Sequence, residues 1–134
     1  MSTKTYHDSC HCGKVQFEAD IDLDAGTGRC NCSICSKLRN WSAIIKPEQF
    51  RLLSGAEHLG SYVWGPVADR KFCRHCGVSL YGIGHLEEVG GDFCSVSIAA
   101  LDDVAPEVLA SIPIRYFDGR HNHWENEPAV KSYL

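Results

Sequence analysis

The sequence has no run of about 18 consecutive apolar residues that could cross a membrane as a helix. It also has no excess of positive charge, because 13 Lys and Arg stand against 17 Asp and Glu, for a formal net charge of −4. Nucleic-acid binding depends on basic side chains that contact phosphates, so this balance disfavours a nucleic-acid partner. The first residues lack the apolar core of a signal peptide. We therefore expect a cytoplasmic protein with no membrane partner and no nucleic-acid partner.

The chain also has little helical periodicity. Apolar and polar residues alternate through Val15–Ile21, which is the period of a strand with one buried face. Shorter segments of the same kind are separated by Gly, Pro, Asn or Asp; they are Trp41–Ile45, Phe50–Leu53, Leu59–Trp64, Ala68–Phe72, Val78–Ile83, Phe93–Ile98 and Ile112–Phe117. The pattern predicts a mainly β fold in a single domain over residues 1–134.

Few segments have the features of helices, and those that do are short. Ser33–Arg39 could form two turns, while Pro47–Gln49 and Ala105–Ala110 could each form one or two, with proline suited to a first turn. The last segment, Asp118–Leu134, is largely polar and follows neither period. We expect it to run over the surface as coil.

Cysteine, in contrast, is abundant: the chain has eight. In a reducing cytoplasm, closely spaced cysteines more often bind a metal than form disulfides. Thiolates are ligands that zinc prefers in proteins. The cysteines fall into three local groups and one that stands alone, so their grouping predicts how many metal sites there are.

Two of the groups have the form of metal knuckles. Cys73 and Cys76 are followed by Gly77, which can take a positive φ in a tight turn. Cys10 and Cys12 are also followed by a glycine, and side chains two apart in an extended segment point the same way. Together they predict a structural zinc on four thiolates, Cys10, Cys12, Cys73 and Cys76, that joins the start of the chain to its middle. The alternative is two unrelated surface pairs.

The third group has one ligand too few for a closed site. Cys30, Cys32 and Cys35 supply three thiolates, and no second pair is left to complete a tetrahedron. Structural zinc has four protein ligands, whereas catalytic zinc typically has three and an open position. We therefore predict a second, catalytic zinc on these three cysteines. Two alternatives stay open: a cysteine exchanged from another group, or closure by a histidine from among His11, His58, His75, His85, His121 and His123.

The other candidate residues have simpler interpretations. Strand alternation places Cys94 on one face with Val96 and Ile98, which favours burial as a small apolar side chain. His121 and His123 stand in a polar segment and are expected in a solvated loop. Five basic residues flank the cysteine groups and are normally solvated, yet they could meet the carboxylates of an anionic thiol substrate: Lys37, Arg39, Arg70, Lys71 and Arg74.

Several ordered motifs resemble one known family. They are Ser9–Phe17 with its Cys-His-Cys-Gly, Cys30–Lys37, Phe72–Gly77 and Leu101–Asp103. Together, from about Ser9 to Pro128, they resemble the glutathione-dependent formaldehyde-activating enzymes, a family that includes the domain of centromere protein V. The resemblance implies a β-tent fold of antiparallel sheets with zinc knuckles. It also implies a structural zinc on the four-cysteine set and a catalytic zinc on the three-cysteine set.

The resemblance further implies an activity and its substrates. The family condenses formaldehyde with glutathione to S-hydroxymethylglutathione, and the reverse reaction classes it as a carbon–sulfur lyase. A small thiol such as glutathione and an aldehyde are therefore the expected partners. One alternative is a zinc module that binds a protein and has no activity. A weaker alternative is a methionine sulfoxide reductase. Phe93–Leu101 faintly resembles the catalytic segment of that family, but the expected Arg before it and Asn after it are missing.

Overall fold

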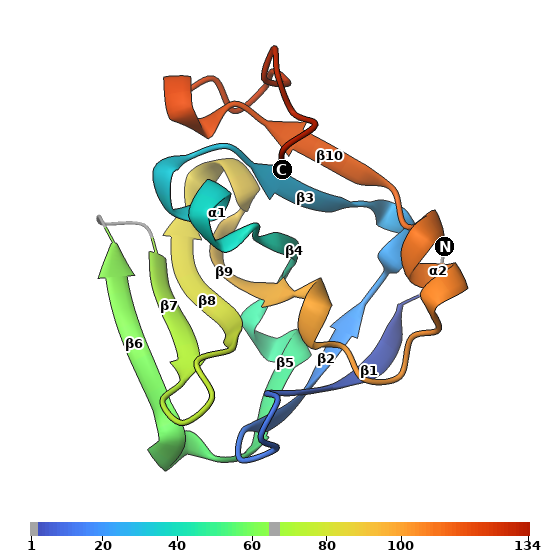
Figure 1. Cartoon of the computed structure of the whole chain (residues 1–134), viewed down its shortest axis with the longest axis vertical. Coiled ribbons are helices and arrows are strands. Elements are labelled where there is room, and N and C mark those ends of the chain that lie inside the picture. The colour runs from blue at the N-terminus through green and yellow to red at the C-terminus, as the bar shows by residue number, and fades with distance from the viewer. Residues whose placement is uncertain (1–2, 65–67) are drawn as a thin grey trace.

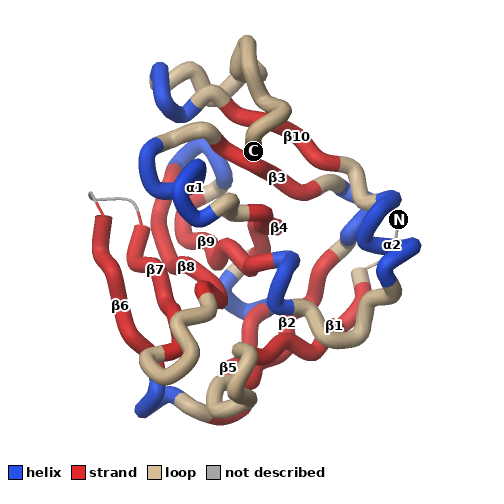
Figure 2. The backbone as a smooth tube through the Cα atoms, in the orientation of Figure 1, coloured by secondary structure: helices blue, strands red, loops and turns tan. Residues whose placement is uncertain are grey.

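The computed structural model describes residues 3–64 and 68–134, so residues 1–2 and 65–67 of the predicted domain lie outside the described part. The mainly β fold is confirmed. The strands form two sheets, and the helices and turns are short and lie at the ends of strands (Figures 1 and 2). No helix in the described part is long and apolar enough to cross a membrane.

The smaller sheet has three antiparallel strands in the order β1-β2-β5. These are β1 (Lys4–Ser9), β2 (Gln16–Ile21) and β5 (Phe50–Ser54). The alternation that predicted β2 is the alternation of its burial, because Phe17, Ala19 and Ile21 are buried while the residues between them are half-buried. This face of the sheet therefore forms one wall of the core.

The larger sheet has seven strands in the order β10-β3-β4-β9-β8-β7-β6. Their bounds are β3 (Thr27–Cys30), β4 (Trp41–Ile45), β6 (Leu59–Trp64), β7 (Ala68–Cys73), β8 (Ser79–Leu86), β9 (Gly91–Ser97) and β10 (Ile114–Phe117). Among the described strands all pairs are antiparallel except β3 with β10, which is parallel. The mainly antiparallel sheets that the family resemblance implied are therefore confirmed, with this one parallel pair at the edge of the larger sheet.

Two α-helices match the expected positions: α1 (Ser33–Leu38) and α2 (Pro106–Ser111). The expected turn Pro47–Gln49 is a 3₁₀ helix, and five further 3₁₀ turns lie at Leu23–Ala25, Ala56–His58, Glu87–Val89, Ile98–Ala100 and Gly119–His121. Beyond residue 117 the chain is otherwise coil, as expected, with one isolated bridge between Asp118 and His123. The strands β1 and β3 were not predicted, because neither segment shows a clear apolar alternation.

The core lies between the two sheets. Phe17 of β2 contacts Phe50 of β5 and Tyr81 of β8, with ring centroids 4.9 Å and 5.5 Å away. Cys94 and Val96 of β9 are also buried in the core, which confirms the interpretation of Cys94 as a small apolar side chain. These contacts hold the small sheet against the large one.

One polar side chain is out of place in this core. Asp8 of β1 is fully buried, and among the described residues neither of its carboxyl oxygens has a hydrogen-bond partner. Burial raises the pKa of Asp8 to about 8, and the negative charges of Asp102 and Asp103 add to the shift. A buried polar group without a partner destabilises the folded state.

Candidate metal centres

The first cysteine cluster lies where the two sheets meet. Cys10 and Cys12 follow β1, in the loop that leads to β2, while Cys73 ends β7 and Cys76 lies in the turn between β7 and β8. The four sulfur atoms all lie within 4.8 Å of one another, with Cys12 Sγ 3.6 Å from Cys10 Sγ and 3.7 Å from Cys73 Sγ. The structure thus brings together the four residues that the spacing had paired.

The two loops turn at a corresponding glycine, although the closing hydrogen bond spans four positions in the Cys73 loop and three in the Cys10 loop. Gly13 and Gly77 both have positive φ, at 81° and 78°, as the knuckle interpretation requires. The Gly77 N–H donates to the carbonyl of Cys73 at 2.9 Å, and the Gly13 N–H donates to that of Cys10 at 3.1 Å. Each turn is therefore closed in a conformation that a side chain at the glycine position would strain.

Backbone N–H groups point at the sulfur atoms of this cluster. The Val15 N–H donates to Cys10 Sγ at 3.4 Å, and the His75 N–H donates to Cys73 Sγ at 3.4 Å. Hydrogen bonds from the backbone of Cys12 and Val78 lower the pKa of the Cys76 thiol to about 6. Such donors favour the thiolate form that binds a metal.

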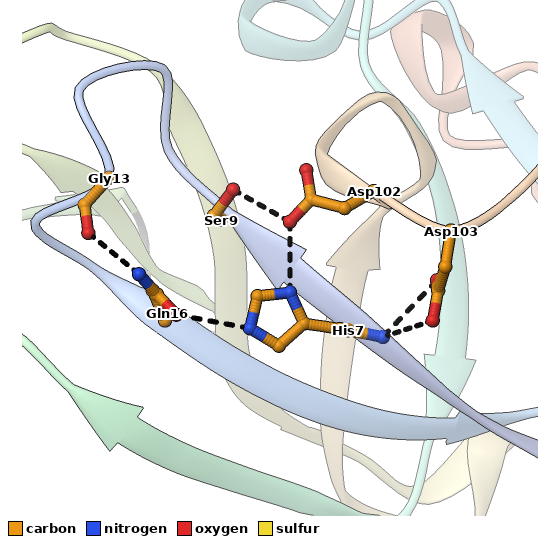
Figure 3. Close-up of polar contacts among 6 residues, drawn as sticks. All are labelled: His7, Ser9, Gly13, Gln16, Asp102 and Asp103. Atoms are coloured by element: carbon orange, nitrogen blue, oxygen red, sulfur yellow. Dashed lines mark hydrogen bonds and ion pairs between the residues drawn. The ribbon is translucent and has the colours of Figure 1, made fainter.

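The strand that leads into Cys10 is held in place by the segment Leu101–Asp103. The Ser9 hydroxyl donates to Asp102 at 2.7 Å, and the His7 ring hydrogen-bonds with the same carboxylate oxygen at 3.0 Å (Figure 3). The backbone N–H of His7 donates to Asp103 at 3.1 Å. From the sequence alone this motif carries only a family resemblance. Its role here is to hold β1 at the first cluster.

Gln16 completes this network at the knuckle itself. Its side-chain N–H donates to the carbonyl of Gly13, and its oxygen hydrogen-bonds with the His7 ring (Figure 3). Although serine, histidine and aspartate meet here, they do not form a nucleophilic triad, because Ser9 donates to Asp102 and not to His7. In a triad the histidine lies between the other two. The network positions the metal loop.

The second cluster lies at the start of α1. Cys30 ends β3, Cys32 caps the helix and Cys35 lies within its first turn. Their sulfur atoms lie within 4.8 Å of one another, and no other Cys, His, Asp or Glu side chain of the described residues joins the group. The structure thus places no exchanged cysteine and no histidine there, which were the two alternatives left open.

The three thiols of this cluster interact with one another, and these contacts shift their pKa values in different directions. The pKa of Cys32 is lowered because its sulfur accepts hydrogen bonds from Cys30 and Cys35, and from the backbone N–H groups of Cys35 and Ile34. The pKa of Cys35 is raised by the contacts of its side chain with Cys30 and Cys32 and by its burial. A cluster in which one sulfur already favours the thiolate form is suited to a cation that binds all three.

Neighbouring segments cover this cluster from two sides. Arg70 of β7 donates a guanidinium N–H to Cys35 Sγ at 3.3 Å. On the other side Gly119 lies against Cys30, because a Cβ placed on it would be 2.5 Å from Cys30 Sγ and 2.6 Å from the Trp124 ring. Buried Asn31 donates to Asp118 at 2.9 Å and so fastens this C-terminal segment to the cluster.

Two hollows are lined by chain neighbours and contacts of the second cluster, although its cysteines line neither. One, of about 370 Å³, is lined by Asn31, Arg120, His121, Pro128, Ala129, Val130 and Tyr133. The other, of about 220 Å³, is lined by Ile34, Leu38, Tyr62, Arg70, Phe72, Gly77 and Ser79. Small molecules commonly bind in hollows of this kind, next to reactive groups.

The side chains of the remaining candidate residues belong to neither group of clustered ligands among the described residues. Burial raises the pKa of the Cys94 thiol to about 12, with Asp8 adding to the shift, so this cysteine lacks the exposed thiolate of a sulfoxide reductase. His58 and His75 hydrogen-bond with each other at 2.8 Å. His121 is exposed, as expected for a surface loop, and its ring hydrogen-bonds with Asp118.

The fold and these sites define a class of protein: mainly β, with two clusters of cysteines that fit zinc knuckles. The model of the family described as "glutathione-dependent formaldehyde-activating enzyme" matches residues 5–116. The chain belongs to that family, which confirms the resemblance carried by its cysteine motifs.

Two further proteins are similar to this chain. A curated protein of Schizosaccharomyces pombe, named as an uncharacterized lyase, is 30% identical over 81 residues, which are 57% of this chain and 56% of that protein. The match thus spans little more than half the length of this relative. The crystal structure of a Rhodobacter sphaeroides protein superimposes with a TM-score of 0.68 at 30% identity, over 81% of this chain and 99% of that one.

Proposed function

We propose that this chain is a zinc-dependent enzyme of the carbon–sulfur lyase type, which forms and cleaves the adduct of a small thiol with an aldehyde. The observation that carries the proposal is the inequality of the two cysteine clusters, four sulfurs in one and three in the other. Four protein ligands close a zinc site, whereas three leave a position for a substrate. The family description, which names glutathione and formaldehyde, supports the choice of a thiol and an aldehyde.

The donor set of the three-cysteine cluster fits zinc. Its sulfur atoms are close enough to contact one ion, and thiolate is a ligand that zinc prefers. The backbone N–H of Cys32 donates to Cys30 Sγ at 3.4 Å, a contact that favours the thiolate. A zinc ion bound there would supply Lewis acidity and would favour the thiolate form of a small thiol at neutral pH.

The protein's own groups provide charge and shielding. In the reaction the thiol loses its proton, the sulfur bonds to the carbonyl carbon, and the aldehyde oxygen gains a proton. Arg70 places a permanent positive charge next to Cys35, which offsets the negative charge that three thiolates and an incoming thiolate bring together. Gly119 lies against Cys30 with the Trp124 ring beside it, so this side of the cluster is covered by the C-terminal segment.

Cobalt substitution tests the open position. The visible spectrum of cobalt reports its ligands, so we expect a small thiol to change the spectrum of the wild type and not that of Cys32→Ser. We also expect Cys32→Ser to lose catalysis of adduct formation, followed by nuclear magnetic resonance with ¹³C-labelled formaldehyde. Cys94→Ser is the matched control, because Cys94 is buried away from both clusters and should leave both measurements unchanged.

The opposite result has a clear meaning. A cobalt centre with four protein ligands at both clusters, and no response to any thiol, would contradict the enzyme and favour a protein-binding zinc module. Catalysis that persists in Cys32→Ser would place the reaction elsewhere in the chain.

A further inference from the structure

The smaller hollow beside the second cluster has an uneven chemical lining. Strand register places Tyr62 of β6 directly opposite Arg70 of β7, so both side chains lie on one face of the large sheet. Arg70 reaches the cluster from this face, since it contacts Cys35 of α1. The groove is lined by residues of α1, β6, β7 and the start of β8, and its Arg70 contacts the three-cysteine cluster.

Arg70 has hydrogen-bonding capacity to spare in this groove. A guanidinium has five N–H donors. One of them contacts Cys35, while Nε is buried and has no hydrogen-bond partner among the described residues. The stem of Arg70 runs beside Gly82, because a Cβ on that glycine would be 3.9 Å from Arg70 Cγ. The guanidinium is thus held at the groove, and its Nη1 group, which has no hydrogen-bond partner among the described residues, is left for an anion.

The remaining walls are mostly apolar. Leu38 and Tyr62 are 41% and 51% exposed, which is high for large apolar side chains. The half-buried Ile34 and Phe72 extend the same surface, and Ser79 adds a single hydroxyl. Exposed apolar surface around one cation suits a ligand with an apolar body and one negative group.

We propose that this groove binds the organic part of the thiol substrate, and that the substrate is a thiol with an apolar or aromatic body and a single carboxylate, which Arg70 binds. This proposal rests on the proposed function, because the substrate sulfur is placed at the three-cysteine cluster. The groove's volume of about 220 Å³ suits such a small molecule.

The same lining disfavours glutathione. That tripeptide carries two carboxylates, an ammonium group and two peptide bonds. The groove offers one cation and mainly apolar walls, so several of those polar groups would lose water without gaining a partner. Arg70 and its groove therefore select against the thiol that the family description names.

Titration of three thiols into the cobalt-loaded protein separates these possibilities. They are 3-(mercaptomethyl)benzoate, phenylmethanethiol and glutathione. Phenylmethanethiol is the first molecule without its carboxylate. Dissociation constants come from the cobalt spectrum. A charge-assisted hydrogen bond predicts that the wild type binds the benzoate about tenfold more tightly than phenylmethanethiol. We expect glutathione to bind more weakly than the benzoate.

Variants assign the preference to one side chain. Arg70→Met should bind both aromatic thiols equally, and Arg70→Lys, which keeps the charge, should retain part of the preference. Lys71→Met is the matched control, since Lys71 is the next residue of β7, pairs with Asp69 and lies on the opposite face. Arg120→Met tests the larger hollow beside the same cluster.

Each outcome has a definite meaning. A preference kept in Arg70→Met, or lost in Arg120→Met instead, would overturn the role of Arg70. Tighter binding of glutathione than of the benzoate would overturn the substrate class while leaving the proposed function in place. If no thiol changes the spectrum of the wild type, the open metal position fails and both proposals fall.

Discussion

The close contact of Gly119 with Cys30 leads to a prediction about the second cluster. Gly119 leaves no room for a side chain between Cys30 and Trp124. We expect Gly119→Ala to displace Cys30 or the C-terminal segment, and so to lower cobalt affinity at the three-cysteine cluster with no change at the four-cysteine cluster. Gly82→Ala is the control, because the nearest atom to its added Cβ would be 3.6 Å away, an ordinary contact. Equal effects of the two variants would contradict this packing.

Burial of Asp8 leads to a prediction about stability. Since its carboxyl oxygens have no partner among the described residues, an apolar side chain of similar size should fit the site better. Asp8→Leu should raise the free energy of unfolding by about 1–3 kcal/mol, measured by urea denaturation. Asp103→Leu should act in the opposite direction, because it removes the acceptor of the His7 N–H. Destabilisation by Asp8→Leu would mean that the carboxyl group has a partner in solution.

At the scale of single elements, the end of the β8–β9 hairpin should respond to pH. His85 of β8 hydrogen-bonds with Asp92 and Glu87, each at 2.7 Å, and these contacts raise its pKa above the ordinary value of 6.5. A raised pKa means that the folded state binds the proton more tightly, so the stabilisation is complete below about pH 6.5 and is lost as the pH rises through the folded value.

Amide hydrogen exchange checks this prediction. The exchange rates of the Gly90 and Gly91 amides, in the turn of the hairpin, should rise between pH 6 and pH 8 by more than the intrinsic pH dependence of exchange explains. His85→Gln should remove that excess, whereas His123→Gln, in the C-terminal segment, should leave it unchanged. The same excess in wild type and His85→Gln would count against the ion pairs as its cause.

The sequence predicted the elements that depend on local patterns and not the contacts between distant segments. Strong alternation predicted β2, and glycine after each cysteine pair predicted the turns with positive φ. The four-cysteine and three-cysteine groups followed from ligand spacing, because spacing reflects local geometry. The β3–β10 pairing, Arg70 beside Cys35 and Gly119 beside Cys30 join segments far apart in the chain, and nothing in their local sequence encodes such contacts.

At the scale of the whole molecule, the two clusters differ in how far apart in the chain the segments that they join lie. The first joins the loop after β1, in the small sheet, to the turn between β7 and β8, in the large one. The second involves only β3 and α1, which are consecutive in the chain. A metal that joins distant segments contributes to folding free energy, whereas one held by a local segment contributes less.

Metal removal should therefore separate the two sites. We expect Cys76→Ser to lose the metal of the first cluster and, with it, on the order of several kcal/mol of folding free energy, which can exceed the net stability of a small domain. Cys32→Ser should bind one metal ion fewer yet keep its cooperative thermal transition and its near-ultraviolet circular dichroism. Metal content and thermal unfolding, measured on both variants beside Cys94→Ser, check the expectation. If Cys32→Ser unfolds while Cys76→Ser remains folded with its metal, the structural and catalytic roles must be exchanged between the clusters, and the open site would then lie where the two sheets meet.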